Sequence, residues 1–349
     1  MVLPYGGCFH KHADREDILT MIRYIIKRLL LMIPVILGVT ILIFTIMYFT
    51  PGDPAQLIMG PNASLEQIEA KRAEMGLDQP YFTRLLNYLN DVFIHGDLGK
   101  SYMNNRSVSG DILDRFPRTA LIAFVSVLLS LIVGIPIGIT SAVGQNTWRD
   151  RVAMVVSLLG VSMPEFWLGL MLVILFSLKL GWLPPSGIGT PAHFILPCVA
   201  CSFFGVAGMA RQTRSSMLEV IRADYITTAR AKGLGEIKVI YRHALRNALI
   251  PIITITGAAF GMSLGGALVI ETVFSIPGLG LYMCKAINMR DYPAIQGSVI
   301  FLAIAFSLVM LITDLVYALV DPRIRSQYQG KRKASRHVFR KVGEQNGSE

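Results

Sequence analysis

The residues best placed to do chemistry lie in one polar stretch between two long apolar runs. Its candidate contact residues are Asp224, Tyr225, Thr227, Thr228, Ala229, Arg230, Ala231, Lys232, Gly233 and Leu234. The pattern predicts a short amphipathic helix that Gly233 can end, because glycine readily adopts the left-handed conformation of a helix C-cap. Small alanines beside Arg230 and Lys232 would let this helix lie in a groove of a partner protein while its charges meet acidic rims. A solvated loop stabilised by lipid headgroups explains the same residues equally well.

A single carboxylate, Glu165, follows Pro164 about midway along an apolar run. A carboxylate at that depth is costly unless it faces water or a partner. Both residues are therefore candidates for lining a solute pathway. Proline also frees a backbone carbonyl and can kink a helix, so a glutamate buried in a network around the kink is an equally good interpretation.

Three glycines, Gly257, Gly261 and Gly265, recur at four-residue spacing in a later apolar run. This spacing gives a helix one smooth face that another helix can approach closely. We favour tight structural packing and keep a sliding surface beside a pathway as the alternative. Glu271 and Asp314 lie near the ends of apolar runs, where interfacial anchoring or helix contact is the favoured role. Glu271 is kept as a further pathway candidate.

Other site chemistry finds no support in the sequence. The chain has neither a G-x-x-x-x-G-K-[ST] phosphate loop nor an H-E-x-x-H zinc motif. Cys198 and Cys201 form a C-x-x-C pair, but they lie in an uncharged run with no second pair or nearby histidine to complete a zinc site. The spans also lack the paired carboxylates, or serine with a base, that an intramembrane protease needs. We expect no enzyme activity, no metal and no cofactor bound by this chain.

The composition places these residues in a membrane protein. Of the 349 residues, 53% are hydrophobic and 16% are charged, against roughly 25% charged in soluble domains. A hydrocarbon core about 30 Å thick is crossed by about 20 apolar residues in a helix. Six runs meet this requirement, which predicts an all-α integral membrane protein with six transmembrane helices. They are residues 29–50, 119–143, 152–178, 194–210, 248–270 and 292–313.

The basic residues set the expected orientation. The net charge is +10, and the Lys and Arg residues flank the apolar runs instead of forming one patch with aromatics between them. This placement favours lipid headgroups over nucleic acid as the neighbour. Basic residues gather before the first run, between the second and third, between the fourth and fifth, and in the tail, whereas 181–194 has no charge. Because cationic residues stay on the cytoplasmic side, we expect both termini there.

The runs divide the chain into segments. We expect a cytoplasmic N-terminal segment (1–28), a first span (29–50), an extracytoplasmic insertion (51–117), a core with a cytoplasmic loop at 211–247 (118–325), and a basic cytoplasmic tail (326–349). The first run is too long for the apolar region of a signal peptide and is interpreted as an anchor. Residues 1–20 show no pattern, and Met21 is an alternative start.

The insertion should form a small helical cap outside the membrane. It carries nine acidic and six basic residues. One helix is predicted over 65–75, with Ser64 as its N-cap and Gly76 after its end, and a second over 82–93. A further turn at 277–280 is expected to re-enter or cap the pore mouth on the same side.

The polar stretch and the residues after it resemble the cytoplasmic coupling loop of binding-protein-dependent ABC importer permeases. That loop reads Glu-Ala-Ala, three residues, Gly, nine residues, Ile, one residue, Leu, Pro, and here Ala229, Gly233 and Leu245 fit it. The departures are Thr227, Thr228, His243 and Arg246, and they resemble the form typical of the dipeptide and oligopeptide permease family. Asp224, one turn earlier, is the candidate to replace the missing acidic contact. Further segments that resemble this family cover nearly all of 21–325.

The resemblance implies a type I ABC importer permease fold in the bacterial inner membrane. It implies that this chain pairs with a second homologous permease, generally a different chain in this branch. Two cytoplasmic ABC ATPases would dock on residues 224–234 and use ATP and Mg²⁺, and an extracytoplasmic substrate-binding protein would deliver cargo. The mechanism is then alternating access, in which closure of the ATPases moves the attached spans.

Peptides are the cargo we favour. The same branch is also associated with nickel, glutathione and some glycosides. Metal transport is disfavoured because the spans lack a cluster of His, Cys and carboxylate ligands. A self-sufficient secondary carrier is the main competitor from another class, but such carriers usually have ten or more spans with internal repeats. An ATPase that co-purifies with this chain would distinguish the two.

Overall fold

The computed structural model describes the backbone of residues 8–320, and side chains within residues 22–316 apart from position 24. The predicted tail at 326–349 lies outside the described residues, as do residues 1–7 of the N-terminal segment. The regular secondary structure of the described part is helical, joined by loops, with one isolated β-bridge between Lys100 and Ser107. This confirms the all-α prediction.

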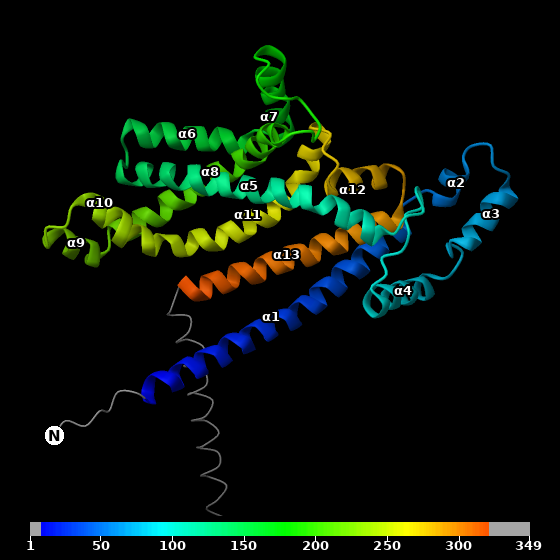
Figure 1. The fold of residues 1–349 in the computed structure, drawn as a ribbon, viewed down its shortest axis with the longest axis horizontal. Coiled ribbons are helices and arrows are strands. Elements are labelled where there is room, and N and C mark those ends of the chain that lie inside the picture. The colour runs from blue at the N-terminus through cyan, green and yellow to red at the C-terminus, as the bar shows by residue number, and fades with distance from the viewer. Residues whose placement is uncertain (1–7, 321–349) are drawn as a thin grey trace, which may run out of the picture.

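Within the described residues, five helices are long and apolar enough to cross a membrane. They are α1 (Cys8–Phe49), α5 (Val108–Val143), α8 (Ile195–Ile221), α11 (Leu245–Val273) and α13 (Tyr292–Val320). Figure 1 shows α5, α8, α11 and α13 running side by side, with α1 at the edge of the bundle. A sixth crossing, if counted, consists of α6 (Trp148–Ser162) together with α7 (Glu165–Leu172) and its π-helical continuation η2 (Val173–Lys179).

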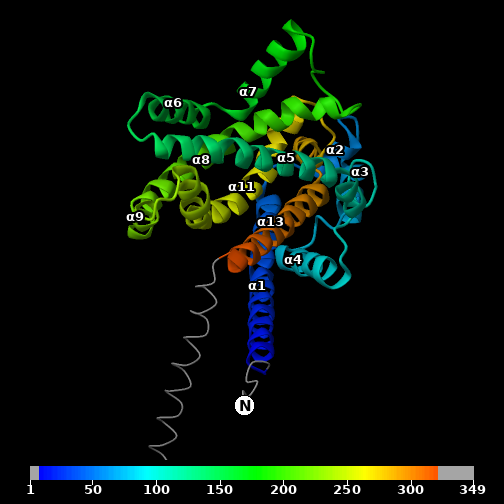
Figure 2. The same cartoon turned by 60° about the vertical axis from the view of Figure 1, so that its left-hand side comes forward.

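The prediction of one continuous span over 152–178 was wrong in its shape. The chain breaks between α6 and α7, and the two parts are bent by 102°. Met163, in the break, has an extended backbone conformation, which is the region favoured for a residue that precedes proline. Pro164 also has no N–H to continue the helix. Figure 2 shows α7 leaving the bundle while α6 stays against it.

The short helices gather at opposite ends of the bundle (Figure 1). One end, called the basic end here, carries α9 (Asp224–Ala231), α10 (Glu236–Lys238) and η4 (Val239–Ala244). The other, called the insertion end, carries α2 (Pro54–Met59), α3 (Leu65–Glu74), α4 (Tyr81–Asn90), η1 (Asp91–His95) and α12 (Leu279–Asn288). The short η3 (Pro191–Phe194) precedes α8.

Local sequence signals predicted two helices of the insertion correctly. Ser64 caps α3 by accepting a hydrogen bond from the Gln67 N–H, and the Gln67 side chain accepts one from the Ser64 N–H in return. This is a capping box, which satisfies two unpaired helix donors at once. The second predicted helix is α4 with η1, ended by Gly96 in the left-handed region. The helix α2 was not predicted.

Several spans extend beyond the apolar runs that predicted them. The helix α5 begins at Val108, whereas its apolar run begins near position 119, and α8 continues to Ile221. The helix α1 likewise begins at Cys8, well before its apolar run. An apolar run marks the part of a helix that crosses the hydrocarbon core; the capping and tertiary contacts of the flanking polar residues decide where the helix ends.

The core is built around the pair α5 and α8, which pack closely along their length. A methyl group at Gly134 or Gly138 would press against α8, in the first case 2.9 Å from the Val206 carbonyl oxygen. Ser126 and Ser130 donate hydrogen bonds across the interface to carbonyl oxygens of α8, both at 3.1 Å. Small residues and interhelical hydrogen bonds of this kind hold helices together in a membrane, because packing apolar side chains between helices gains little over their contact with lipid tails.

Candidate functional site

The polar stretch at the basic end forms α9, as predicted, and presents a polar outer face. Its exposed residues are Asp224, Tyr225, Thr227, Thr228, Arg230, Ala231, Lys232 and Gly233. Leu234 is half-buried, and Ala229 is buried within the chain itself. Ala229 therefore packs within this chain, whereas the other predicted contact residues of α9 are exposed and accessible to a partner protein.

The inner face of α9 belongs to the core. Ile226 and Ala229 pack in one cluster with Met217 of α8, Ile139 of α5 and Ile240 of η4. Tyr225 and Asn247 add a hydrogen bond from α9 to α11, with Asn247 Nδ2 2.7 Å from the Tyr225 hydroxyl. A load applied to the outer face of α9 is thus transmitted to α5, α8 and α11 through packed side chains.

The turn after α9 depends on Gly233. Its φ is +78°, in the left-handed region, and its N–H donates to the Arg230 carbonyl at 2.9 Å. Glycine adopts this conformation without the steric cost of a β-carbon, so the predicted cap is confirmed. Arg230 then donates two hydrogen bonds to Glu236 of α10, at 2.7 and 3.2 Å. These bonds raise the pKa of Arg230 and lower the pKa of Glu236, so a charged pair closes the turn at neutral pH.

An ion pair that the sequence analysis missed lies behind this surface. Arg214 of α8 binds Asp150 of α6 in a bidentate pair, and Asp150 is 3% exposed. The Asp150 carboxylate also accepts hydrogen bonds from the Ser141 hydroxyl and from the Asn146 N–H, the latter at 2.9 Å. A buried carboxylate is tolerated when it is fully paired in this way. The sign of this ion pair in the sequence was a single acidic residue, Asp150, between two basic residues, Arg149 and Arg151.

Glu165 lies at the sharp bend between α6 and α7, where α7 packs against α8 and α11. Its side chain is half-buried and faces Gly266 of α11, where a methyl group would sit 2.9 Å from Oε2. Its neighbour Pro164 is exposed. The position of Glu165 between three helices fits both interpretations offered by the sequence, a pathway residue and a kink residue.

The three glycines of α11, Gly257, Gly261 and Gly265, do not all have the same surroundings. A methyl group at Gly257 would overlap Thr313, and one at Gly261 would overlap the ring of Phe306, both on α13. Gly265 has no neighbour within 4 Å of such a methyl group. Two of the three glycines therefore serve close packing within this chain, and Gly265 is the one with open space beside it.

Glu271 holds the insertion end together. Its side chain is fully buried and accepts hydrogen bonds from the Thr119 hydroxyl at 2.5 Å and from the Leu281 N–H at 3.0 Å. Thr119 in turn accepts one from the Leu279 N–H at 2.9 Å. The carboxylate thus caps the first turn of α12, where a negative charge is favoured. The side chain has no exposed surface in this structure, and its bonds support the interpretation of Glu271 as a helix contact over that of a pathway residue.

Two further carboxylates join elements far apart in the sequence. Asp314 of α13 binds Arg28 of α1 at 3.1 Å, which confirms its predicted role as a helix contact. Asp291, at the insertion end, accepts hydrogen bonds from the Ser101 hydroxyl at 2.5 Å and the Tyr102 N–H at 3.0 Å. Among the described residues, no group of three or more His, Cys, Asp and Glu is placed to hold a metal ion.

The fold and these sites define a helical, multi-spanning membrane protein with one rigidly mounted polar helix at its basic end. The chain belongs to the family of binding-protein-dependent transport system inner membrane components, whose model matches residues 134–326. The N-terminal model of the same family matches residues 21–123. The chain is accordingly an ABC importer permease subunit and a transporter component, not an enzyme.

Curated relatives support this assignment over most of the chain. A glutathione transport system permease protein from Escherichia coli strain K12 is 42% identical over 305 residues, which is 87% of this chain and 99% of that protein. The corresponding protein of Salmonella choleraesuis is 43% identical over the same shares. Among solved structures, a MetNI methionine ABC transporter in an inward-facing form gives a TM-score of 0.53 at 18% identity, covering 60% of this chain and 96% of that chain. This last similarity supports the fold alone.

Proposed function

We propose that this chain forms half of a translocation pathway for short peptides and is driven by ATPases that dock on α9. The observation that carries the proposal is the construction of α9. Its outer face is polar and exposed, while its inner face is part of the core that joins α5, α8 and α11. A helix built in this way can pass the movement of a docked ATPase directly to the spans.

The proposal includes an orientation and a set of partners. The basic end faces the cytoplasm and the insertion end faces outward, as the Lys and Arg residues favour. A second, homologous permease completes the pathway, two ATPases bind ATP and Mg²⁺, and a binding protein delivers cargo at the insertion end. The family description, which names dependence on a binding protein, supports the last of these partners.

Cargo is proposed from the relatives. Glutathione is itself a short peptide with one unusual linkage, and the curated relatives of this chain at 42–43% identity are glutathione permeases. We therefore propose short peptides as the cargo class and glutathione as the first individual candidate. Nickel is disfavoured because no candidate metal site occurs in the described part of the chain.

The proposal is tested by uptake into proteoliposomes that contain this chain with its permease and ATPase partners and the binding protein. We expect ATP-dependent uptake of radiolabelled glutathione or of a tripeptide. The variant Gly233→Asp should insert normally and lose uptake, because it alters both the conformation and the charge of the α9 turn. Normal uptake by this variant would contradict docking on α9, and uptake without any ATPase would contradict the transport mechanism.

A further inference from the structure

The helix formed by α4 and η1 has an apolar face that no part of the described chain covers. Phe82 is 74% exposed and Leu86 is 65% exposed, and their spacing of four residues places both on one side of α4. Phe93 and Ile94, which are 42% and 74% exposed, continue the apolar surface in η1. Leu89, half-buried, completes the stripe. A row of large apolar side chains on an exposed helix marks a surface that has a partner.

The depth of this helix follows from its contacts with α1. The Tyr81 hydroxyl, in its first turn, lies 2.8 Å from Thr45 Oγ1, and the Tyr88 ring stacks on Phe44 with centroids 5.5 Å apart. Thr45 and Phe44 precede the last residue of α1, Phe49, by four and five positions. At 1.5 Å per residue they lie roughly 6 to 8 Å inside the end of this apolar helix. The helix α4 therefore lies beside the final turns of a span, at the level of the membrane interface.

The stripe is also continuous with the exposed apolar surface of α1, a helix long and apolar enough to cross the membrane. Only 11% of the most apolar window of α1 is buried inside the protein, and Phe49 at its end is 73% exposed. The Tyr81 ring connects the two helices, with centroids 6.3 Å from Phe49 and 5.2 Å from Phe82. Aromatic side chains concentrate where a protein passes from hydrocarbon to headgroups.

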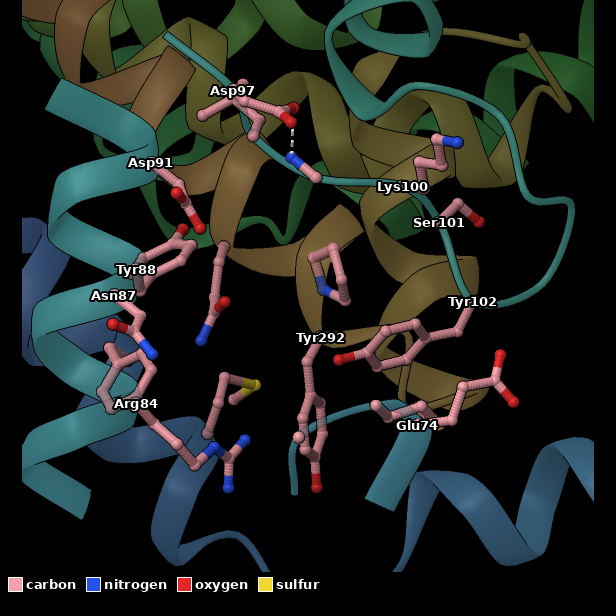
Figure 3. Close-up of a pocket in the computed structure, with 18 of the residues that line it drawn as sticks. Glu74, Arg84, Asn87, Tyr88, Asp91, Asp97, Lys100, Ser101, Tyr102 and Tyr292 are labelled. Atoms are coloured by element: carbon pink, nitrogen blue, oxygen red, sulfur yellow. Dashed lines mark hydrogen bonds between the residues drawn. The ribbon is translucent and has the colours of Figure 1, made fainter. Parts of the chain in front are cut away.

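The opposite face of the helix is polar and turned inward. Arg84, Asn87, Tyr88 and Asp91 line a cavity of about 770 Å³ between the insertion and the ends of α1 and α13. Figure 3 shows these four side chains along one side of α4, facing the cavity. A polar inner face and an apolar outer face together make an amphipathic interfacial helix.

We propose that α4 and η1 lie on the membrane surface at the insertion end, with Phe82, Leu86 and Phe93 inserted into the adjacent lipid leaflet. Part of the insertion, expected to be a cap in solvent, is then a membrane-bound platform. Lipid fits better than a protein partner because the stripe continues the exposed apolar side of a membrane-spanning helix, through the adjoining rings of Phe49, Tyr81 and Phe82. The proposal does not depend on the cargo or on α9.

The test places a single cysteine at Phe82, Leu86 or Asn87 of the full-length chain, with the native cysteines replaced by alanine. Each variant carries an environment-sensitive fluorophore and is reconstituted, in its complex, into vesicles of phosphatidylethanolamine and phosphatidylglycerol. Quenching is measured with a nitroxide on the lipid acyl chain and with iodide in the buffer. Asn87 is the matched control, because it is exposed on the same helix but lies on the cavity side.

We expect blue-shifted emission at positions 82 and 86, with a ratio of nitroxide to iodide quenching severalfold above that at position 87. Iodide quenching at 82 and 86 as strong as at 87 would overturn the proposal in favour of a solvated helix. Protection of 82 and 86 from both quenchers would also overturn it, because a protein would then cover the stripe.

Discussion

The guanidinium of Arg214 binds the carboxylate of Asp150 through two parallel hydrogen bonds, with Nε 2.7 Å from Oδ1 and Nη2 2.8 Å from Oδ2. Arg214 lies near the end of α8, which leads into α9, and Asp150 lies in the first turn of α6. The pair therefore joins α8, which leads into the proposed ATPase surface on α9, to α6, which ends at Ser162 just before the bend that holds Glu165. Motion of α9 would reach the bend between α6 and α7 along this route.

Asp150→Asn should destabilise the protein, because it leaves the Arg214 charge in a largely buried site without its counter-ion. Loss of one partner of a buried ion pair costs about 3 to 5 kcal/mol. Thermal unfolding in detergent measures the effect. Arg230→Ala is the matched control, since it breaks a bidentate pair of the same kind on the surface, where we expect no measurable change. Equal stability of the two variants would contradict a structural role for the buried pair.

Gly257→Ala should destabilise the bundle, whereas Gly265→Ala should not. A methyl group at buried Gly257 overlaps the Cβ and methyl group of Thr313, and overpacking of this kind costs about 1 to 3 kcal/mol. The same methyl group at Gly265 meets open space. Thermal unfolding of the two variants compares these two positions of one helix. If Gly257→Ala is as stable as the parent protein, α11 and α13 do not pack as closely as described.

Thr119→Val should loosen α12. The valine cannot donate to Glu271 or accept from the Leu279 N–H, and a buried polar group left without its partner costs about 1 to 3 kcal/mol. We expect a lower unfolding temperature and faster proteolysis between α11 and α12. Thr272→Val is the control, because Thr272 is exposed and bonds within its own helix. Unchanged proteolysis in Thr119→Val would show that α12 is held by other contacts.

Much of this architecture follows from local sequence signals. Each predicted span corresponds to a helix or to a bent helix pair, because an apolar run of sufficient length has one stable solution in lipid. Ser64 and Gln67 specify the start of α3 because both halves of a capping box lie within four residues. Gly233 specifies the end of α9 in the same local way.

The contacts that hold the sites in place have no such local signal. Asp150 and Arg214 are 64 positions apart, and Thr119 and Glu271 are 152 positions apart. Each residue alone is compatible with a solvated end of a helix. Only the packing of α6 against α8, and of α5 against α11, brings the partners together. The bend at Pro164 was visible as a potential kink, but its angle depends on what α7 packs against.

Glu165→Gln should separate the two interpretations of the bend. The substitution keeps the shape of the side chain and removes its charge. For a pathway residue we expect a severalfold lower uptake rate with an unchanged unfolding temperature, since a charge facing the pathway contributes little to the fold. Glu69→Gln, on exposed α3, should change neither quantity. A large drop in unfolding temperature for Glu165→Gln would identify the carboxylate as part of a kink network instead.

The central claim is that the outer face of α9 is the surface that the ATPase grips. Cysteine cross-linking in the assembled complex tests it most directly, with one cysteine at Thr228 of α9 and, in a separate variant, one at Thr83 of α4. Both threonines are exposed on short helices, at opposite ends of the bundle. The account predicts a covalent adduct with the ATPase from position 228 and none from position 83. An adduct from position 83, or its absence from position 228 in an active complex, would contradict it.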